Sequence, residues 1–168
     1  MLLVAPEATA QADTGLPFHV RPEIALRPLV DEAARRSPIV RALIDRLQQT
    51  DVTVYIRTRA FVSSDLDGRV ALLAVTEHRR YLMIEISCRG SLLVQMSTLG
   101  HELYHAMEIA LEPSIVDART LAAHYQRIGT ERGHGAGRQT FETEGAYATG
   151  LRVRRELLTA RPRPVQGE

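Results

Sequence analysis

The sequence predicts an α+β domain in which an N-terminal helix, a small three-stranded antiparallel sheet, a long central helix and a C-terminal helix follow one another. Three observations predict it. Apolar residues recur at helical spacing over residues 38–47 and return to it from residue 91 onward. Between these stretches lie three short extended runs within residues 51–87, of which the first and third alternate and the second is apolar on both faces. With 168 residues, 45% of them apolar, the chain can bury one core of ordinary size, so we expect a single domain over residues 29–159.

The two ends of the chain are expected to lie outside this domain. Residues 1–28 are rich in Ala and Pro and lack periodicity, as does the tail of residues 160–168, so we expect a flexible arm and a flexible tail. Residues 1–12 combine a short apolar run with a small-x-small end, which would fit the remnant of a secretory signal. Export therefore stays open, and the compartment is not predicted.

The first elements expected are helices. In the stretch SPIVRALIDRLQQT, Ser37 suits the N-cap and Pro38 suits the first turn, and the apolar residues fall on one stripe. A shorter helix is expected before it, over residues 29–36.

Three extended runs, DVTVYIRTR, GRVALLAVT and RYLMIEIS, predict the strands of the sheet. The link EHRR between the last two has the length of a hairpin turn, and Asp67 and Gly68 favour a turn between the first two. Each strand is therefore expected to pair antiparallel with the next one along the chain.

A long helix is expected from Ser91 to Pro113, where the proline ends it. At 100° per residue its apolar side chains gather on one side, opposite His101 and His105. The residues of this core face are Leu92, Met96, Leu99, Leu103, Met107 and Ala110.

Three elements are expected after this helix. Another helix runs from Ser114 or Asp117 to Ile128, with Gly129 as its C-terminal stop. The stretch TERGHGAGRQ then predicts a glycine-rich loop, and the last helix is expected to begin near Thr140.

The composition excludes several classes of function. With 21 basic and 20 acidic residues, the chain lacks the excess positive charge that nucleic acid binding needs. Lys and Asn are absent, which removes Schiff-base chemistry, the phosphate-binding loop and N-glycosylation. Cys88 alone can form neither an internal disulfide nor a thiolate metal site, and we expect a buried, inert thiol. No apolar stretch is long enough to span a membrane, so a soluble protein is expected.

The stretch STLGHELYHAMEIA places two histidines four residues apart. On a helix, His101 and His105 point the same way, with a separation that suits two ligands of one zinc ion. Glu102 is rotated by 100° from His101, which puts it beside the ion, where a general base can reach water. The alternative is a solvated helix face that carries these residues by chance.

The residues HELYH match the HExxH motif and resemble the zincin metallopeptidases. The order of elements resembles the minimal gluzincin core, and the chain looks like a group of uncharacterised bacterial proteins that carry TLGHELxHAxEIA followed by an acidic-Thr-x-x-Ala segment. The resemblance would cover residues 38–158. It implies one zinc ion, Glu102 as the base, and a peptide or protein substrate that pairs with an exposed edge strand, expected at residues 80–87.

Two histidines and water leave a tetrahedral zinc site one protein ligand short. The metzincin extension is absent, since Glu108 and Leu111 stand where it has Gly and His. Gluzincins use a Glu from a later helix, although the Asn that precedes this Glu in the thermolysin-like pattern is absent here. Of the candidates Glu142, Glu144 and Glu108, Glu142 is preferred because it borders the small, apolar face of the last helix.

Several other residues are candidates for supporting roles. Glu108 shares the histidine face of its helix, where it would orient the ring of a ligand histidine or lie exposed as a plain surface carboxylate. The residues that could stabilise an oxyanion are His134, His124, Tyr125 and Tyr147, and none is preferred.

The function expected from these residues is that of a zinc-dependent metallopeptidase, in which Glu102 is the general base for a metal-activated water. Two alternatives stay open. One is a zincin-like module that binds metal without catalysis, and the other is a zinc hydrolase that acts on a non-peptide amide. The oligomeric state is not predicted.

Overall fold

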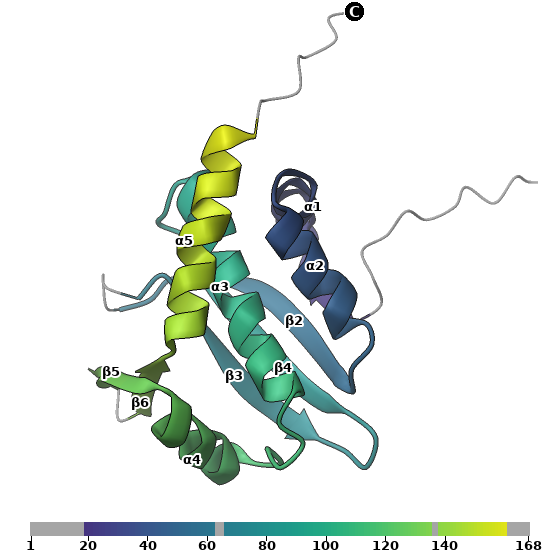
Figure 1. Ribbon diagram of the computed structural model, residues 1–168, viewed down its shortest axis with the longest axis vertical. Helices are drawn as coiled ribbons and strands as arrows, with labels where there is room; N and C mark the ends of the chain where they lie inside the picture. The colour runs from purple at the N-terminus through teal and green to yellow at the C-terminus, as the bar shows by residue number, and fades with distance from the viewer. Residues whose placement is uncertain (1–18, 63–65, 136–137, 161–168) are drawn as a thin grey trace, which may run out of the picture.

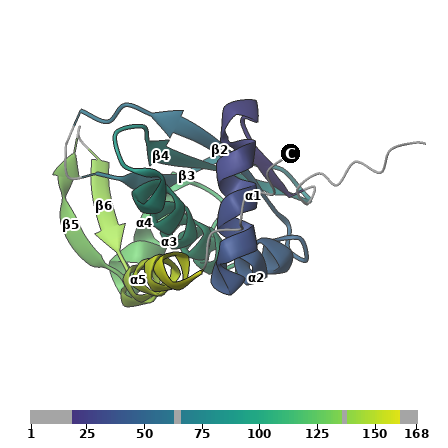
Figure 2. The ribbon, with the colours of Figure 1, turned by 90° about the horizontal axis from the view of Figure 1, so that it is seen from above.

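The computed structural model describes residues 19–62, 66–135 and 138–160. They form an α+β fold in which one face of a mixed sheet is covered by helices (Figures 1 and 2). The described elements, in chain order, are β1 (Val20–Pro22), η1 (Ile24–Leu26), α1 (Arg27–Arg36), α2 (Pro38–Leu47), β2 (Val52–Arg59), β3 (Gly68–Val75), β4 (Arg80–Ser87), α3 (Leu92–Ala110), α4 (Ala118–Ile128), β5 (Thr130–Gly135), β6 (Arg138–Glu142) and α5 (Glu144–Thr159).

The predicted helices are found close to their expected positions. The Ser37 side chain accepts a hydrogen bond from the Val40 amide at the start of α2, and the Ser91 side chain does the same for Val94 at the start of α3. Asp117 caps α4, which ends at Gly129 as expected. Local sequence signals were sufficient to place these helix ends.

The sheet differs from the predicted three-stranded antiparallel arrangement. Its order is β1-β2-β4-β3, with β2 parallel to both β1 and β4. The hairpin between β3 and β4 is antiparallel, as predicted. The pairing of β2 with β3 was wrong, because the chain after β2 crosses to the far side of β4. The strand of residues 80–87 is therefore central, and the edge strands of this sheet are β1 and β3.

A buried carboxylate links β4 to both of its neighbouring strands. Glu85 is 1% exposed on the sheet face opposite α3, and the guanidinium groups around it come from both neighbouring strands. Arg57 and Arg59 of β2 lie 2.5 and 2.9 Å from Glu85 Oε1, and Arg69 of β3 donates to Oε2. Because these arginines come from β2 and from β3, Glu85 can contact all of them only if β4 lies between the two strands.

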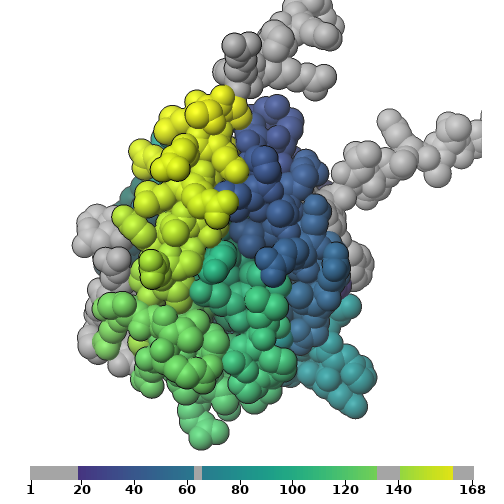
Figure 3. Space-filling view, in the orientation of Figure 1, coloured from purple at the N-terminus to yellow at the C-terminus, as the bar shows by residue number. Residues whose placement is uncertain are grey.

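The core lies between the sheet and the helices. Leu82, Ile84 and Ile86 of β4 are fully buried, as are Leu99 and Leu103 of α3. Most of the predicted core face of α3 is buried, and Leu92 at its start is the exception. α5 packs along α3, so these two helices and α1 and α2 share one face of the molecule (Figure 3).

Two segments have more structure than the sequence predicted. Residues 20–26, expected in a flexible arm, form β1 and η1, and Val20 is buried against the core. The glycine-rich stretch after Gly129 forms the hairpin of β5 and β6, in which Thr130 pairs with Glu142. This hairpin is formed by backbone pairing, which needs no periodic pattern of apolar residues. The sequence therefore contains no signal from which the hairpin could be predicted.

Three further expectations concerned a membrane span, Cys88 and the two ends of the chain. No helix within the described ranges is long and apolar enough to cross a bilayer. Cys88 is exposed, so the expectation of a buried thiol was wrong: the alternation of β4 ends at Ser87. The suspected signal remnant at residues 1–12 and the tail from residue 161 lie outside the described residues.

Arg80 joins the sheet to the end of α3. Its side chain is 4% exposed and forms two hydrogen bonds of 2.7 Å with the carboxylate of Asp51. The same guanidinium donates to the last carbonyls of α3 and of the turn after it, those of Ile109, Ala110 and Glu112. It therefore satisfies helix-end acceptors that have no partner within the helix.

Replacing Arg80 with Leu is expected to lower the free energy of unfolding by ~3–5 kcal/mol, because the substitution removes the donor to the buried Ala110 carbonyl and leaves Asp51 without its partner. Urea denaturation measures the change. Arg46→Leu, on the exposed side of α2, is the matched control and should stay within ~0.5 kcal/mol of the wild type. Equal stabilities of the two variants would contradict this role of Arg80.

The Glu85 cluster predicts a pH dependence of stability. Burial opposes ionisation, but the three guanidinium groups lower the pKa of Glu85 from an ordinary 4.5 to about 2 in the folded protein. The stabilisation is therefore complete above about pH 4.5 and is lost as the pH falls through about 2. We expect Glu85→Gln to be less stable than the wild type at neutral pH, with a gap that narrows over this interval.

Urea denaturation at several pH values across this interval measures the gap, and Glu77→Gln serves as the control because Glu77 is exposed in the turn between β3 and β4. The control should follow the wild type at every pH. A gap between the wild type and Glu85→Gln that stays constant down to about pH 2 would show that the charge of Glu85 is not the cause.

Candidate metal centre

The two histidines of the motif lie one turn apart on α3 and point toward the same place. Their ring centroids are 4.9 Å apart, and the ring planes are nearly perpendicular. His105 is buried, while His101 is partly open on the side that faces a cavity. The predicted geometry of the imidazole pair is therefore present.

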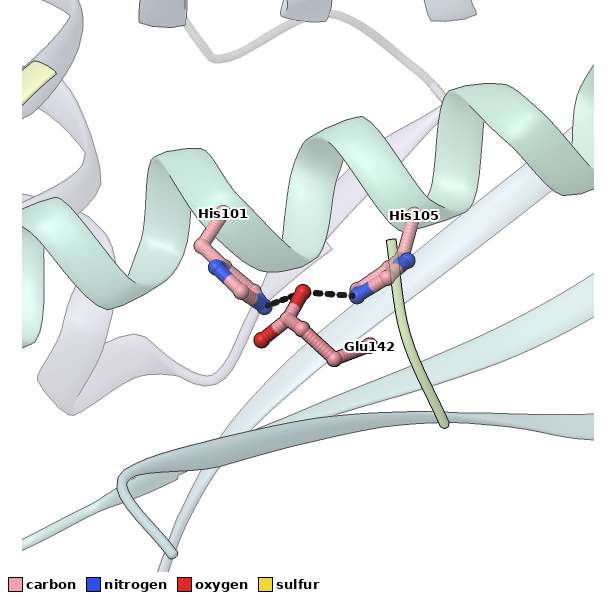
Figure 4. Close-up of side chains that lie close together, drawn as sticks. All are labelled: His101, His105 and Glu142. Atoms are coloured by element: carbon pink, nitrogen blue, oxygen red, sulfur yellow. Dashed lines mark ion pairs between the residues drawn. The ribbon is translucent and has the colours of Figure 1, made fainter. Parts of the chain in front are cut away.

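Glu142 reaches between the two rings (Figure 4). Its Oε1 atom lies 3.4 Å from Nε2 of His101 and 3.6 Å from Nε2 of His105. One ligand atom from each of the three side chains lies within 4.8 Å of the other two. The structure thus brings together the three residues that the sequence favoured as ligands.

Glu142 lies on a strand and not on the last helix, where it was predicted. Glu142 is the last residue of β6, two positions before α5 begins at Glu144, and not a member of the helix. Glu144 is exposed in the first turn of α5 and is not part of the cluster. The helix begins later than predicted because Thr143 caps it, accepting a hydrogen bond from the Ala146 amide at 3.1 Å.

The N-cap of α5 also fixes the carboxylate. The Thr143 amide donates to Oε1 of Glu142 at 3.0 Å, and the Thr143 hydroxyl donates to Oε1 of Glu108 at 2.8 Å. The helix packs closely on α3, since a Cβ atom on Gly150 would lie 3.3 Å from the Cβ of His101. Glu142 is therefore held against the imidazoles by hydrogen bonds and by helix packing.

The spacing of the three donors fits a zinc ion. In a tetrahedral site with bonds of about 2.0–2.1 Å, neighbouring ligand atoms are about 3.4 Å apart. The two separations from Glu142 are 3.4 and 3.6 Å, and all three donor atoms lie within 4.8 Å of one another. Two imidazole nitrogens and one carboxylate oxygen are the donor set of a catalytic zinc site that keeps one position open.

Glu102 lies on the same helix between the histidines and is buried beneath the cavity. A Cβ atom on Gly68, the first residue of β3, would lie 2.8 Å from Oε1 of Glu102 and 2.5 Å from Cγ2 of Thr98. Glycine therefore lets β3 approach the carboxylate, whereas the sequence suggested a turn. Burial raises the pKa of Glu102 to about 7, and a nearby cation would act in the opposite direction.

The electrostatics of the centre favour a positive charge between the rings. Burial alone would lower the pKa of His105, but hydrogen bonds to Glu108 and Glu142 raise it to about 9. Burial and the neighbouring His105 lower the pKa of His101. Burial acts to raise the pKa of Glu142, and the imidazoles nevertheless hold it below its usual value. The same carboxylates that favour a protonated imidazole would favour a metal cation.

Glu108 lies behind the imidazole pair and contacts both ligand-bearing segments. Its Oε2 atom lies 2.8 Å from Nδ1 of His105, on the side of the ring opposite Glu142. Its other oxygen accepts the hydroxyl of Thr143. Of the two roles open for Glu108, the contacts favour the one in which it orients a ligand histidine.

The four candidates for oxyanion stabilisation lie in different places. Tyr147 of α5 lines the cavity beside the centre and is about half exposed. Tyr125 is buried behind His105, where its hydroxyl contacts the His105 carbonyl at 3.3 Å, and His124 contacts Glu112 away from the cavity. His134 lies on β5 opposite Gln139, and its side chain is outside the described part of the chain. Among the described candidates, Tyr147 alone faces the cavity.

Comparisons of the chain with models of protein families, with curated proteins and with solved structures find no match. The motif residues and the geometry of this centre are therefore what indicates a function for the chain.

Replacing Glu108 with Ala is expected to weaken zinc binding about 10- to 100-fold, because the ring of His105 loses its hydrogen-bond acceptor and Thr143 loses its link to α3. Competition with a chromophoric chelator measures the affinity. Glu144→Ala removes an exposed carboxylate close by and should bind zinc like the wild type. Unchanged affinity in a folded Glu108→Ala protein would show that Glu108 does not support the centre.

Proposed function

We propose that the protein is a zinc-dependent metallopeptidase that hydrolyses peptide bonds. The observation that carries the proposal is the convergence of His101, His105 and Glu142, with the carboxylate of Glu102 buried beside them. The resemblance of HELYH to the zincin motif supports the same reaction. His101, His105 and Glu142 would hold one zinc ion.

A zinc ion at this place supplies Lewis acidity, which polarises a carbonyl and acidifies water. Glu102 accepts a proton from the water that attacks the peptide carbonyl and passes it to the leaving amine. Tyr147 faces the same cavity and is the candidate donor to the oxyanion that develops on the carbonyl oxygen. Glu108 keeps the His105 ring in the orientation that presents Nε2 to the ion.

The cavity has room for substrate beside an edge strand. It measures ≈ 280 Å³, and Gly68 at the start of β3 forms part of its wall next to His101 and Glu102. β3 pairs with β4 on one side, and within the described residues its other edge has no strand partner. An extended substrate backbone that pairs with β3 would pass the catalytic carboxylate, so β3 takes the role first expected of residues 80–87.

Glu102→Gln is expected to retain one zinc ion per chain and to lose hydrolysis by about 10²- to 10⁴-fold, because the amide cannot accept the proton. Elemental analysis gives the zinc content, and digestion of casein and of a peptide library gives the activity. Glu144→Gln, an exposed carboxylate outside the cluster, should keep both. A chelator should abolish the wild-type activity, and added zinc should restore it.

The possible outcomes separate the alternatives. Full activity of Glu102→Gln would remove the base assignment. One zinc ion without hydrolysis of any substrate would favour a metal-binding module, and hydrolysis of other amides but no peptide would favour a different zinc hydrolase. Absence of zinc binding by the wild type would contradict the proposal as a whole.

A further inference from the structure

The cavity beside the metal centre continues along α5 to an arginine. Tyr147, Gly150, Leu151 and Arg154 line it from that helix, and they share one helix face because their spacing is three, four and seven residues from the first. Gly150 lies against His101. Arg154 is one turn further along α5, about 6 Å along the helix axis. α5 packs against α3 (Figure 1).

Arg154 has no anionic partner of its own. Among the described residues it makes neither an ion pair nor a side-chain hydrogen bond, and its side chain is exposed. Several other arginines are paired with carboxylates: Arg57, Arg59 and Arg69 with Glu85, Arg80 with Asp51, and Arg127 with Glu112. The exposed Arg152 and Arg155 of α5 do not line the cavity. The guanidinium at the cavity wall therefore keeps its full capacity to bind a carboxylate from a ligand.

The rest of the cavity wall suits a ligand of this kind. Tyr147 and Leu151 are about half exposed and offer apolar surface between the metal centre and Arg154. Asp67 lines the cavity from the segment before β3 and would repel a carboxylate from that side. Besides the histidine, the charged groups of the wall are thus Arg154 on α5 and the carboxylates of Asp67, Glu102 and Glu142, of which Glu102 and Glu142 belong to the metal centre.

We propose that Arg154 is a specificity-determining residue that binds a carboxylate of the substrate. The preferred substrates are then peptides in which an acidic side chain, or the free C-terminal carboxylate, lies close to the bond that is cleaved. This inference rests on the proposed peptidase function. The aliphatic part of an acidic residue packs on Leu151, and its carboxylate accepts hydrogen bonds from the guanidinium.

The test uses matched peptides that differ at one position near the scissile bond, where they carry Glu, Gln or Lys, each with a free or an amidated C-terminus. The wild-type enzyme should cleave the Glu peptide with a kcat/KM about three- to tenfold above that of the Gln peptide. Arg154→Ala should remove this preference, and Arg154→Glu should shift it to the Lys peptide. A preference that depends on the free C-terminus instead would identify the terminal carboxylate as the ligand.

Arg152→Ala is the matched control, because Arg152 is an exposed arginine of the same helix that does not line the cavity. It should keep the wild-type preference. The inference is overturned if the wild type does not discriminate between the Glu and Gln peptides in either C-terminal form, or if Arg154→Ala discriminates as the wild type does.

A binding measurement keeps this inference separate from the proposed function. Fluorescence anisotropy records the binding of the same labelled peptides to zinc-loaded Glu102→Gln protein, with and without Arg154→Ala. If the wild type hydrolyses no peptide, the peptidase proposal fails. The binding measurement then still tests whether Arg154 binds a carboxylate of the peptide. The inference is supported if the peptides with the extra carboxylate bind more tightly and Arg154→Ala removes this difference. It is refuted if all peptides bind equally.

Discussion

The centre depends on close packing between α3 and α5, which brings ligands from two distant segments to one point. α3 supplies both imidazoles, and its opposite side is buried in the sheet, so the direction of the rings is fixed by the core. Glu142 comes from the end of β6 and has no such support from its own strand. It is positioned because α5 packs on α3 at Gly150 and because Thr143 donates to Glu108 of α3. Any loosening of this helix pair would separate the donors.

The order of the strands in the sheet puts β3 beside the cavity. Glu85 pairs with basic residues of both neighbouring strands, and in this strand order β4 lies in the centre and β3 lies at an edge beside α3. An edge strand at this place leaves backbone donors and acceptors free beside Glu102, whereas a central strand would have used them for pairing. The ion pairs of Glu85 on one face of the sheet thus link the strands in the same order that puts β3 beside the cavity on the other face.

Much of this arrangement could be predicted from the sequence, and the failures share one cause. The helices and the three long strands carry strong local signals: caps at Ser37 and Ser91, and apolar periodicity. The ligands followed from helix geometry and from the small, apolar face of the last helix, although Glu142 itself lies just before that helix. The order of the strands and the hairpin that ends at Glu142 depend on contacts between distant residues, which periodicity does not encode. One signal for the strand order was present in the sequence: β4 carries a single acid, Glu85, while β2 and β3 carry arginines. This signal places β4 between β2 and β3 only when the pairing of charges across neighbouring strands is considered.

The burial of charge argues against a solvated helix face as the explanation of the motif. Glu102 and His105 are almost fully buried, and Glu108 and Glu142 are only slightly exposed, so several ionisable groups share a small volume with little water. Carboxylates so close together repel one another, and their loss of hydration is costly unless a positive charge compensates for it. Two imidazoles can carry such a charge only while protonated, whereas a divalent cation carries it at every pH at which the imidazoles are free to bind. A protein that gained nothing from this cluster would be more stable with apolar residues at the same positions, so the cost itself favours a function for the site.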